Sequence, residues 1–241
     1  MHKIYIFDVD GTLTPSRRPM THDFEEFFYE WSKNKKYYLV SGSDLEKIKE
    51  QIGHLYLDRA EGIFTCGGNK FYIDNKLEYE NKFKPPETLL TYLGELIRFS
   101  DTPVQSTNHR EDRGSMLNFS VVGRDCTLEE RQKYFEWDNL NGERKDIARA
   151  IGYRWPELDA VIGGQISIDI YPKGHDKSQI LDIIEQERLV KPNEYIFIGD
   201  RTEIGGNDYP LAKLMQKKDN CSYYNTRDWK HTKLILESLN D

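Results

Sequence analysis

The stretch IYIFDVDGTLT, residues 4–14, decides which fold the rest of the chain must complete. It begins with a run of β-forming apolar side chains and then breaks into an Asp-x-Asp-Gly-Thr loop. This pattern predicts a buried strand that ends in a tight loop. Ligands of open α/β sheets bind beyond the carboxyl ends of the strands, so we expect this loop to carry the chemistry.

Two carboxylates stand two positions apart in this loop, at Asp8 and Asp10. Alternate residues of an extended chain share one face, so both side chains can be directed at one point. Ionising two adjacent carboxylates is costly unless a cation lies between them, and an all-oxygen set suits Mg²⁺. A carboxylate can also be the nucleophile that forms an aspartyl-phosphate. The loop predicts Mg²⁺-assisted phosphoryl transfer, with an Asx-type turn ahead of Gly11 as the purely structural alternative.

Length and charge limit the remaining possibilities. The chain has 241 residues, with 34 Lys and Arg against 41 Asp and Glu and a formal net charge of −7. Such a length fits one large domain, or a core domain with another inserted in it. The acidic balance argues against a nucleic-acid partner. An anionic substrate would therefore need a local cluster of Arg or Lys.

The sequence also bears on the compartment. No apolar run reaches membrane-spanning length, and the chain enters its first strand directly after Met1-His2-Lys3, which predicts that there is no signal peptide. Three widely spaced cysteines, Cys66, Cys126 and Cys221, match neither a disulfide framework nor a zinc site. They fit a reducing compartment. We expect a cytoplasmic protein with no membrane partner.

Strands and helices alternate at both ends of the chain, as is typical of a parallel sheet. Residues 1–83 predict strands at 4–7, 37–40 and 62–65, helices beginning at Thr21 and at 45–52, and a hairpin that turns at Asp74-Asn75. Residues 172–241 predict a helix after 176–178, a strand at 195–198, a helix from 205–208, a strand at 222–224 and a terminal helix. We expect these two segments to form one interrupted α/β core.

Three helix starts are predicted from capping residues. Thr21 can cap the first helix, and Ser43 with Glu46 and Thr127 with Glu130 have the spacing of a capping box.

The pattern changes between residues 84 and 171. Helices are predicted at about 89–97, 127–137 and 143–151, and period-2 strands at 117–121 and 165–170. In the latter strand three isoleucines face the core, while Ser167 and Asp169 share the opposite face. This region is predicted to be an inserted α+β domain.

Further polar residues follow the predicted strands of the core or stand at helix starts. They are Ser41, Lys177, Asp200 and Asp208. Strand ends of a parallel sheet meet at one edge, so Asp200 can supply a third carboxylate for a metal and Lys177 a positive charge for a phosphate and for Asp8. Individually, Ser41 and Asp200 could be turn residues and Lys177 a solvated lysine.

This set of residues resembles the haloacid dehalogenase superfamily. The resemblance rests on Asp8-Val9-Asp10-Gly11-Thr12, Ser41, Lys177 and Gly199-Asp200 with Asp208. Over nearly its full length the chain is similar to the eukaryotic-type phosphomannomutase family, by residues 7–14 with Arg17, 41–44, 113–118, 123–131, 163–169, 174–177 and 199–208. The resemblance implies a Rossmann-like core with a parallel sheet and an inserted C2-type α+β cap domain.

The resemblance also implies roles for the matching residues. Asp8 would be the nucleophile, and Asp10 the general acid and base. Asp8, the backbone carbonyl of Asp10 and Asp200 would hold Mg²⁺, with Asp208 in the same acidic set. The sugar phosphate would be bound by Arg17, Arg113, Arg124, Arg131, Ser167 and Asp169. Several Arg forks would supply the local positive field that this acidic protein otherwise lacks.

The function implied is the interconversion of a hexose 6-phosphate and a hexose 1-phosphate, with mannose the expected sugar and a hexose 1,6-bisphosphate as activator and intermediate. By the same resemblance a homodimer through the cap is expected. One alternative is an Mg²⁺-dependent sugar-phosphate phosphatase with water as the acceptor, a reading that Ser41 suits. Another is a non-catalytic sugar-phosphate sensor, which the complete set of catalytic residue types disfavours.

Overall fold

The computed structural model describes residues 3–187 and 192–239. The chain divides into two compact units, one formed by Met1–Glu80 with Asp176–Asp241 and the other by Asn81–His175. Residues 1 and 2, part of the amino-terminal segment from which the lack of a signal peptide was predicted, lie outside the described residues. No helix in the described ranges combines the length and the apolar character that crossing a bilayer requires.

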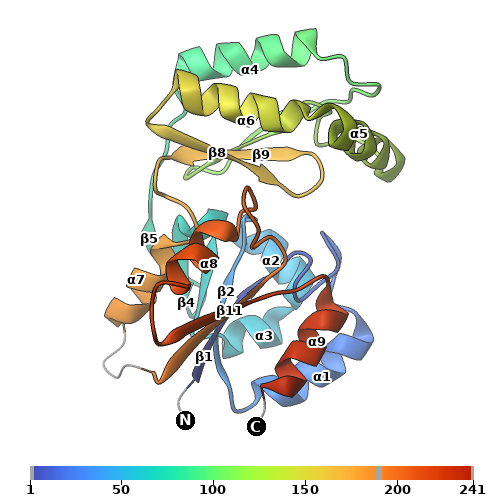
Figure 1. Ribbon diagram of the computed structural model, residues 1–241. Helices are drawn as coiled ribbons and strands as arrows, with labels where there is room; N and C mark the ends of the chain where they lie inside the picture. The colour runs from blue at the N-terminus through green and yellow to red at the C-terminus, as the bar shows by residue number, and fades with distance from the viewer. Residues whose placement is uncertain (1–2, 188–191, 240–241) are drawn as a thin grey trace. The chain divides into compact units, whose positions relative to one another are not determined.

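Within the described residues, the first unit contains a seven-stranded sheet in the order β11-β10-β1-β2-β3-β4-β5 (Figure 1). Its strands are β1 (Lys3–Asp8), β2 (Lys36–Val40), β3 (Gly62–Thr65), β4 (Lys70–Ile73), β5 (Lys76–Glu80), β10 (Glu194–Gly199) and β11 (Cys221–Asn225). The strands from β11 to β3 pair in parallel, and β4 and β5 add an antiparallel hairpin. The hairpin turns at Asp74 and Asn75, both with positive φ, as a type I′ turn requires.

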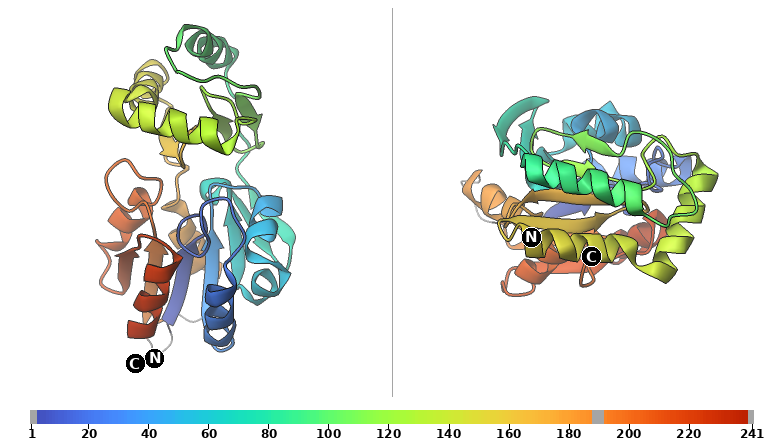
Figure 2. Two further views of the ribbon diagram at one scale, coloured as in Figure 1. Left: turned by 90° about the vertical axis from the view of Figure 1, so that its right-hand side faces the viewer. Right: turned by 90° about the horizontal axis from the view of Figure 1, so that it is seen from above.

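Helices cover both faces of this sheet, as the left view of Figure 2 shows. They are α1 (His22–Ser32), α2 (Leu45–Ile52), α3 (His54–Arg59), α7 (Gln179–Glu187), α8 (Tyr209–Met215) and α9 (Trp229–Ser238), with a short 3₁₀ turn at Cys66–Gly68. Helices α1, α2, α3 and α9 pack on one face and α7 and α8 on the other, because alternate residues of the central strands point to opposite faces.

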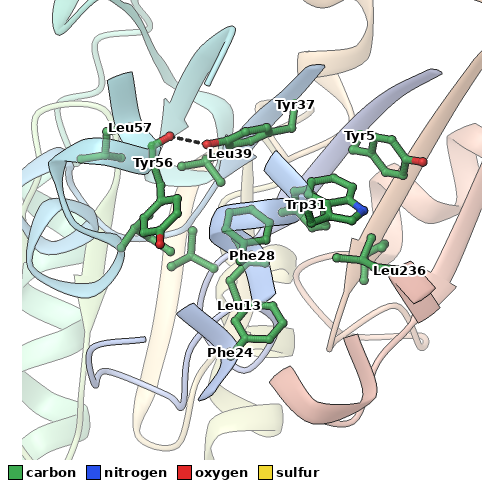
Figure 3. Close-up of a cluster of buried hydrophobic side chains, with 14 of the residues drawn as sticks. Tyr5, Leu13, Phe24, Phe28, Trp31, Tyr37, Leu39, Tyr56, Leu57 and Leu236 are labelled. Carbon is green, nitrogen blue, oxygen red and sulfur yellow. Dashed lines mark hydrogen bonds between the residues drawn. The ribbon is translucent and has the colours of Figure 1, made fainter. Parts of the chain in front are cut away.

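Aromatic side chains dominate the first of these two cores (Figure 3). Phe28 of α1 packs edge-on against Phe7 of β1, with ring centroids 5.8 Å apart, and stacks on Trp31 at 5.4 Å. The hydroxyl of Tyr37 donates to the carbonyl oxygen of Tyr56 at 2.6 Å, so this buried polar group is satisfied. The face of α1 that carries Phe24, Phe28 and Trp31 is therefore the face that packs in the core with β1 and β2.

The second unit has a four-stranded sheet, counted over the described residues, in the order β6-β7-β9-β8 with every pair antiparallel. Its elements are α4 (Glu87–Phe99), β6 (Arg110–Asp112), β7 (Leu117–Phe119), α5 (Leu128–Asn141), α6 (Glu143–Arg154), β8 (Leu158–Gly163) and β9 (Ser167–Pro172). Helices α4 and α6 lie side by side over one face of this sheet (Figures 1 and 2). Ile166, Ile168 and Ile170 contribute to the core beneath them, as their alternation predicted.

The helix starts were predicted with mixed success. Thr127 and Glu130 form the predicted capping box. Thr21 stands at the N-cap of α1, as predicted, but the expectation that its side chain makes a capping bond is wrong. The Ser43–Glu46 capping box is also wrong, because Asp44 is the cap of α2 and accepts from the backbone N–H of Lys47. Ser43 instead donates its own N–H to the hydroxyl oxygen of Ser41.

Candidate active site

Asp8 ends β1 and is almost completely buried, with 3% of its surface exposed. Its Oδ1 accepts from Nζ of Lys177 at 2.6 Å, and its Oδ2 accepts from the hydroxyl of Thr12 at 3.3 Å. Burial, reinforced by Asp208 and Asp200 and opposed by Lys177, raises the pKa of Asp8 well above its ordinary value. The carboxylate is thus held firmly, and its charge requires cationic neighbours.

Lys177 stands two residues before α7 and is 2% exposed. Its ammonium group lies 2.6 Å from Oδ1 of Asp8 and 2.6 Å from Oδ1 of Asp208. Burial alone would lower the pKa of Lys177, but Asp208 and Asp8 raise it above its ordinary value, so the side chain is a fixed cation.

Asp8, Asp200 and Asp208 each offer one carboxylate oxygen, and these oxygens lie within 4.8 Å of one another. Asp208 turns its side chain to Lys177 and to the backbone N–H of Arg201 instead of capping α8, which begins at Tyr209. Burial and the neighbouring Asp208 raise the pKa of Asp200 to about 7. Three hard oxygen donors with this excess of negative charge suit a divalent cation such as Mg²⁺.

The loop after β1 is folded against this acidic cluster. Gly11 has a φ of +81°, and a Cβ at this position would lie 2.4 Å from Oδ2 of Asp200. Its N–H donates to the carbonyl oxygen of Thr14 at 2.9 Å. Any residue with a Cβ at position 11 would therefore strain the backbone and clash with the carboxylate of Asp200.

Asp10 lies in the same loop, with its Oδ1 accepting two hydrogen bonds. The backbone N–H of Arg17 donates at 2.7 Å and Nε2 of Gln51 at 2.9 Å. The side chain of Arg17 is exposed, and its φ is +58°. Gln51 was not predicted from the sequence. The signal was available, because a polar residue three positions after Ile48 falls on the apolar face of α2.

Ser41 directly follows β2, the neighbour of β1, and Asp8 is in register with Val40. The residue is 1% exposed. Its backbone N–H donates to the carbonyl oxygen of Phe64 at 2.9 Å, while its hydroxyl oxygen accepts from Ser43 at 3.0 Å. The structure thus places Ser41 at the same edge of the sheet as Asp8.

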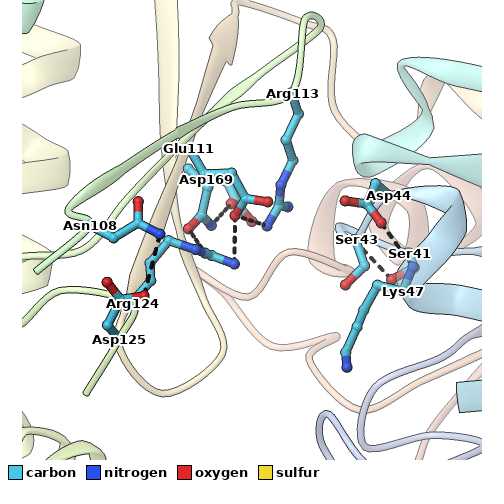
Figure 4. Close-up of polar contacts among 11 residues, drawn as sticks. Ser41, Ser43, Asp44, Lys47, Asn108, Glu111, Arg113, Arg124, Asp125 and Asp169 are labelled. Atoms are coloured by element: carbon cyan, nitrogen blue, oxygen red, sulfur yellow. Dashed lines mark hydrogen bonds and ion pairs between the residues drawn. The ribbon is translucent and has the colours of Figure 1, made fainter. Parts of the chain in front are cut away.

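Two of the predicted arginines meet at a glutamate in the second unit (Figure 4). Oε2 of Glu111 lies 3.0 Å from Nη2 of Arg113 and 2.5 Å from Nη2 of Arg124. Arg124 also donates to Oδ1 of Asn118, whose amide donates to Oδ1 of Asp169 at 2.6 Å. This network brings Arg113, Arg124 and Asp169 together. Glu111 and Asn118 were not predicted from the sequence. Asn118 alternates with the apolar Leu117 and Phe119 of β7, and this alternation is the signal that could have singled it out.

Arg131, near the start of α5, has another environment. It is 9% exposed, and among the described residues no carboxylate forms an ion pair with its guanidinium. Burial and the nearby Arg124 lower the pKa of Arg131, with Cys126 opposing them. The Oγ atom of Ser167 is buried and has no hydrogen-bond partner in the described part of the chain. Such a guanidinium and such a hydroxyl are both groups that an anionic or hydroxylated ligand would satisfy.

The architecture is a haloacid dehalogenase-type fold. The structure is similar to that of a haloacid dehalogenase-like hydrolase from Bacteroides thetaiotaomicron, with a TM-score of 0.63 and 15% identity, covering 99% of this chain and 100% of that one. It also resembles the C-terminal domain of trehalose-6-phosphate phosphatase from C. albicans, with a TM-score of 0.63 and 12% identity over 99% and 92% of the two chains. The predicted fold class is confirmed.

Sequence comparison identifies the family. The model of the eukaryotic phosphomannomutase family matches residues 24–229. Phosphomannomutases of Encephalitozoon cuniculi and Drosophila melanogaster are each 37% identical to this chain; both alignments cover 86% of it, with 83% and 85% of the relatives. The chain belongs to the eukaryotic phosphomannomutase family, which is a family of enzymes. The resemblance on which the sequence interpretation relied is confirmed.

Proposed function

We propose that this protein interconverts a hexose 6-phosphate and a hexose 1-phosphate, mannose being the expected sugar, through an aspartyl-phosphate and a hexose 1,6-bisphosphate. The observation that carries the proposal is the pairing of buried Asp8 with Lys177 beside Asp200 and Asp208, in a chain of this family. A buried carboxylate whose charge is balanced by one lysine can receive a phosphoryl group without leaving an unpaired cation.

In this mechanism Asp8 attacks the phosphorus of a hexose bisphosphate. A bond forms between a carboxylate oxygen of Asp8 and phosphorus, and the bond from phosphorus to the sugar oxygen breaks. Asp10 gives a proton to the leaving oxygen. After the hexose monophosphate binds in the other orientation, Asp10 removes the proton of the accepting hydroxyl, and the phosphoryl group returns to sugar. Ser41, at the same sheet edge, would donate its hydroxyl hydrogen to a phosphoryl oxygen.

Mg²⁺ would be held by Asp8, Asp200 and the backbone carbonyl of Asp10, with Asp208 in the surrounding acidic set. The fit rests on the three carboxylate oxygens within 4.8 Å and on the raised pKa of Asp200, since a cation relieves their mutual repulsion. When bound, the ion would polarise the transferring phosphoryl group and neutralise its charge. Lys177 favours the ionised form of Asp8, against the effect of burial, and orients its carboxylate.

The second unit would be the cap domain, inserted at about residues 84–171, that binds the distal phosphate and the sugar. Arg113, Arg124 and Arg131 would bind phosphate oxygens, joined by Arg17 of the first unit. Ser167 and Asp169 would contact sugar hydroxyls. Among the described residues, the buried guanidinium of Arg131 has no ion-pair partner and the buried hydroxyl of Ser167 has no hydrogen-bond partner, and both observations support this assignment. Closure of the cap would exclude water, which competes as an acceptor.

A homodimer formed through the cap remains a prediction by analogy, which light scattering coupled to gel filtration would test. A cytoplasmic location remains a prediction as well. It is in keeping with free thiols at Cys66, Cys126 and Cys221.

The deciding assay supplies mannose 1-phosphate, Mg²⁺ and a trace of hexose 1,6-bisphosphate. Formation of mannose 6-phosphate supports the mutase, whereas free phosphate as the sole product would support a phosphatase, which the comparisons do not favour. Asp8→Asn should remove turnover at an unchanged circular dichroism spectrum. Substantial remaining turnover in that variant would contradict the role of Asp8.

A further inference from the structure

Gln51 lies near the carboxyl end of α2, on the face that packs into the core with Ile48 and Ile52. It is 2% exposed. A glutamine at such a position loses its contacts with water, so its amide must find partners within the protein or be destabilising. The hydrogen-bond partners of this amide therefore show which residues Gln51 holds in place.

The amide nitrogen of Gln51 has two acceptors, and both lie in the loop after β1. It donates to Oδ1 of Asp10 at 2.9 Å and to Oγ1 of Thr14 at 3.2 Å. These bonds use both of its hydrogens. Within the described residues, its buried Oε1 has no hydrogen-bond partner. The amide is thus oriented with its donor side toward the loop, although its acceptor side gains nothing.

Asp10 is held unequally at its two oxygens. Oδ1 accepts from Gln51 and from the backbone N–H of Arg17, which donates at 2.7 Å. Two hydrogen bonds to the same oxygen restrict the rotation of the carboxyl group, so they also fix the direction of Oδ2.

We propose that Gln51 is a positioning residue for Asp10: its amide holds Oδ1 and so fixes the orientation of the carboxyl group relative to the reacting sugar oxygen. This inference rests on the proposed function, in which Asp10 is the general acid and base. Gln51 touches neither substrate nor reacting atoms in this scheme. Its effect arises from geometry, because a proton transfer requires a separation of about 2.6–3.2 Å between its heavy atoms.

Removing the amide should lower the chemical rate and leave substrate binding nearly unchanged. For Gln51→Leu we expect kcat for hexose phosphate to fall about 10- to 100-fold, since small misplacements of a reacting group can cost that much, while KM stays within about twofold. Gln51→Glu keeps the size of the side chain but presents a carboxylate to Oδ1 of Asp10. Its kcat should be no higher than that of Gln51→Leu.

Thr14→Val is the matched control, because it removes the other acceptor of the Gln51 amide and leaves the bond to Asp10. Its kcat should fall less than about threefold. The melting temperature of each variant is measured alongside, with Gln51→Met as a second apolar replacement if the leucine variant does not fold. Single-turnover rates of Gln51→Leu in the Asp10→Asn background complete the set, where no further loss is expected because the partner is already gone.

The proposal is overturned if Gln51→Leu retains the kcat of the natural protein, if Gln51→Glu restores it, or if the leucine replacement costs as much in the Asp10→Asn background as it does alone. A loss seen in KM instead of kcat would also overturn it. Absence of any phosphoryl transfer by the natural protein would instead refute the proposed function, so the two failures are distinct.

Discussion

Lys177 and Asp8 are 169 positions apart in the sequence, yet Nζ of the lysine lies 2.6 Å from Oδ1 of the aspartate, and both side chains are buried. The same ammonium group lies 2.6 Å from Oδ1 of Asp208. One cation therefore links the first strand, the start of α7 and the start of α8.

Lys177→Met should leave Asp8 and Asp208 buried and facing one another without their cation. We expect kcat to fall by about 10³-fold or more and the unfolding free energy to drop by about 3–5 kcal/mol, the usual cost of breaking a buried ion pair. Steady-state assays and urea denaturation measure the two effects. Lys173→Met, at an exposed position four residues earlier, is the control and should change neither. Normal turnover by Lys177→Met would rule out the electrostatic role.

The acidic cluster predicts an unusual pH dependence for the metal-free protein. The pKa of Asp200 is about 7 in the fold against an ordinary value of 3.8, and that of Asp8 is shifted in the same direction. Between about pH 4 and pH 7 the folded state binds a proton that the unfolded state has released. Stability should therefore fall as the pH rises through this window.

Mg²⁺ should reverse this trend, because it binds the ionised carboxylates and replaces the proton. At a hundredfold excess over its dissociation constant it should add about 2.7 kcal/mol at pH 7.5, and chelation with EDTA should remove the gain. Thermal melts at pH 5 and pH 7.5, with and without the ion, measure both effects. Asp200→Asn is the control and should weaken the dependence on pH and on metal. Melting curves unaffected by Mg²⁺ would argue against a cation site.

Arg131→Ala should impair the interconversion of hexose phosphates more than the hydrolysis of a small phosphate ester. Its guanidinium is buried and unpaired by any described carboxylate, so its removal deprives the distal phosphate of a bidentate partner. We expect kcat/KM for the sugar phosphate to fall about 100-fold, as for the loss of a charged hydrogen bond of roughly 2–3 kcal/mol. Arg149→Ala, at an exposed ion pair with Asp146, is the control. Equal losses of kcat/KM on the hexose phosphate and on the small ester would contradict the role of Arg131 in binding the distal phosphate.

Arg144 and Asp138 form the buried ion pair of the second unit, with Nε and Oδ2 2.7 Å apart. Arg144 also donates to the carbonyl oxygen of Gly164 at 2.9 Å, which fixes the loop before Ser167. Arg144→Met should cost about 3–5 kcal/mol, since it leaves Asp138 buried and unpaired. Urea denaturation provides the measurement. Arg149→Met, in its exposed pair, should cost less than about 1 kcal/mol, and a similar cost for both variants would refute the argument.

Much of the fold could be predicted because its signals are local. The apolar run at 4–7, the alternation of Ile166, Ile168 and Ile170, and the Asp74-Asn75 turn each depend on neighbours in the sequence. The local signals did not select every capping residue correctly. Ser43 and Asp44 are both good caps, and only the direction of the backbone after β2 selects Asp44.

The sequence by itself determined the alternation of strands and helices in the core, the placing of Asp8, Ser41 and Asp200 after strands, and the family to which the chain belongs, but it did not reveal α3, β6 or β8. Only the tertiary structure decided that Lys177 joins Asp8 to Asp208, that Gln51 donates to Asp10, and that Glu111 lies between two arginines. Periodicity and capping act over a few residues. A hydrogen-bond partner of a buried side chain is selected by the packing of segments that are far apart in the sequence, and no local pattern records that choice.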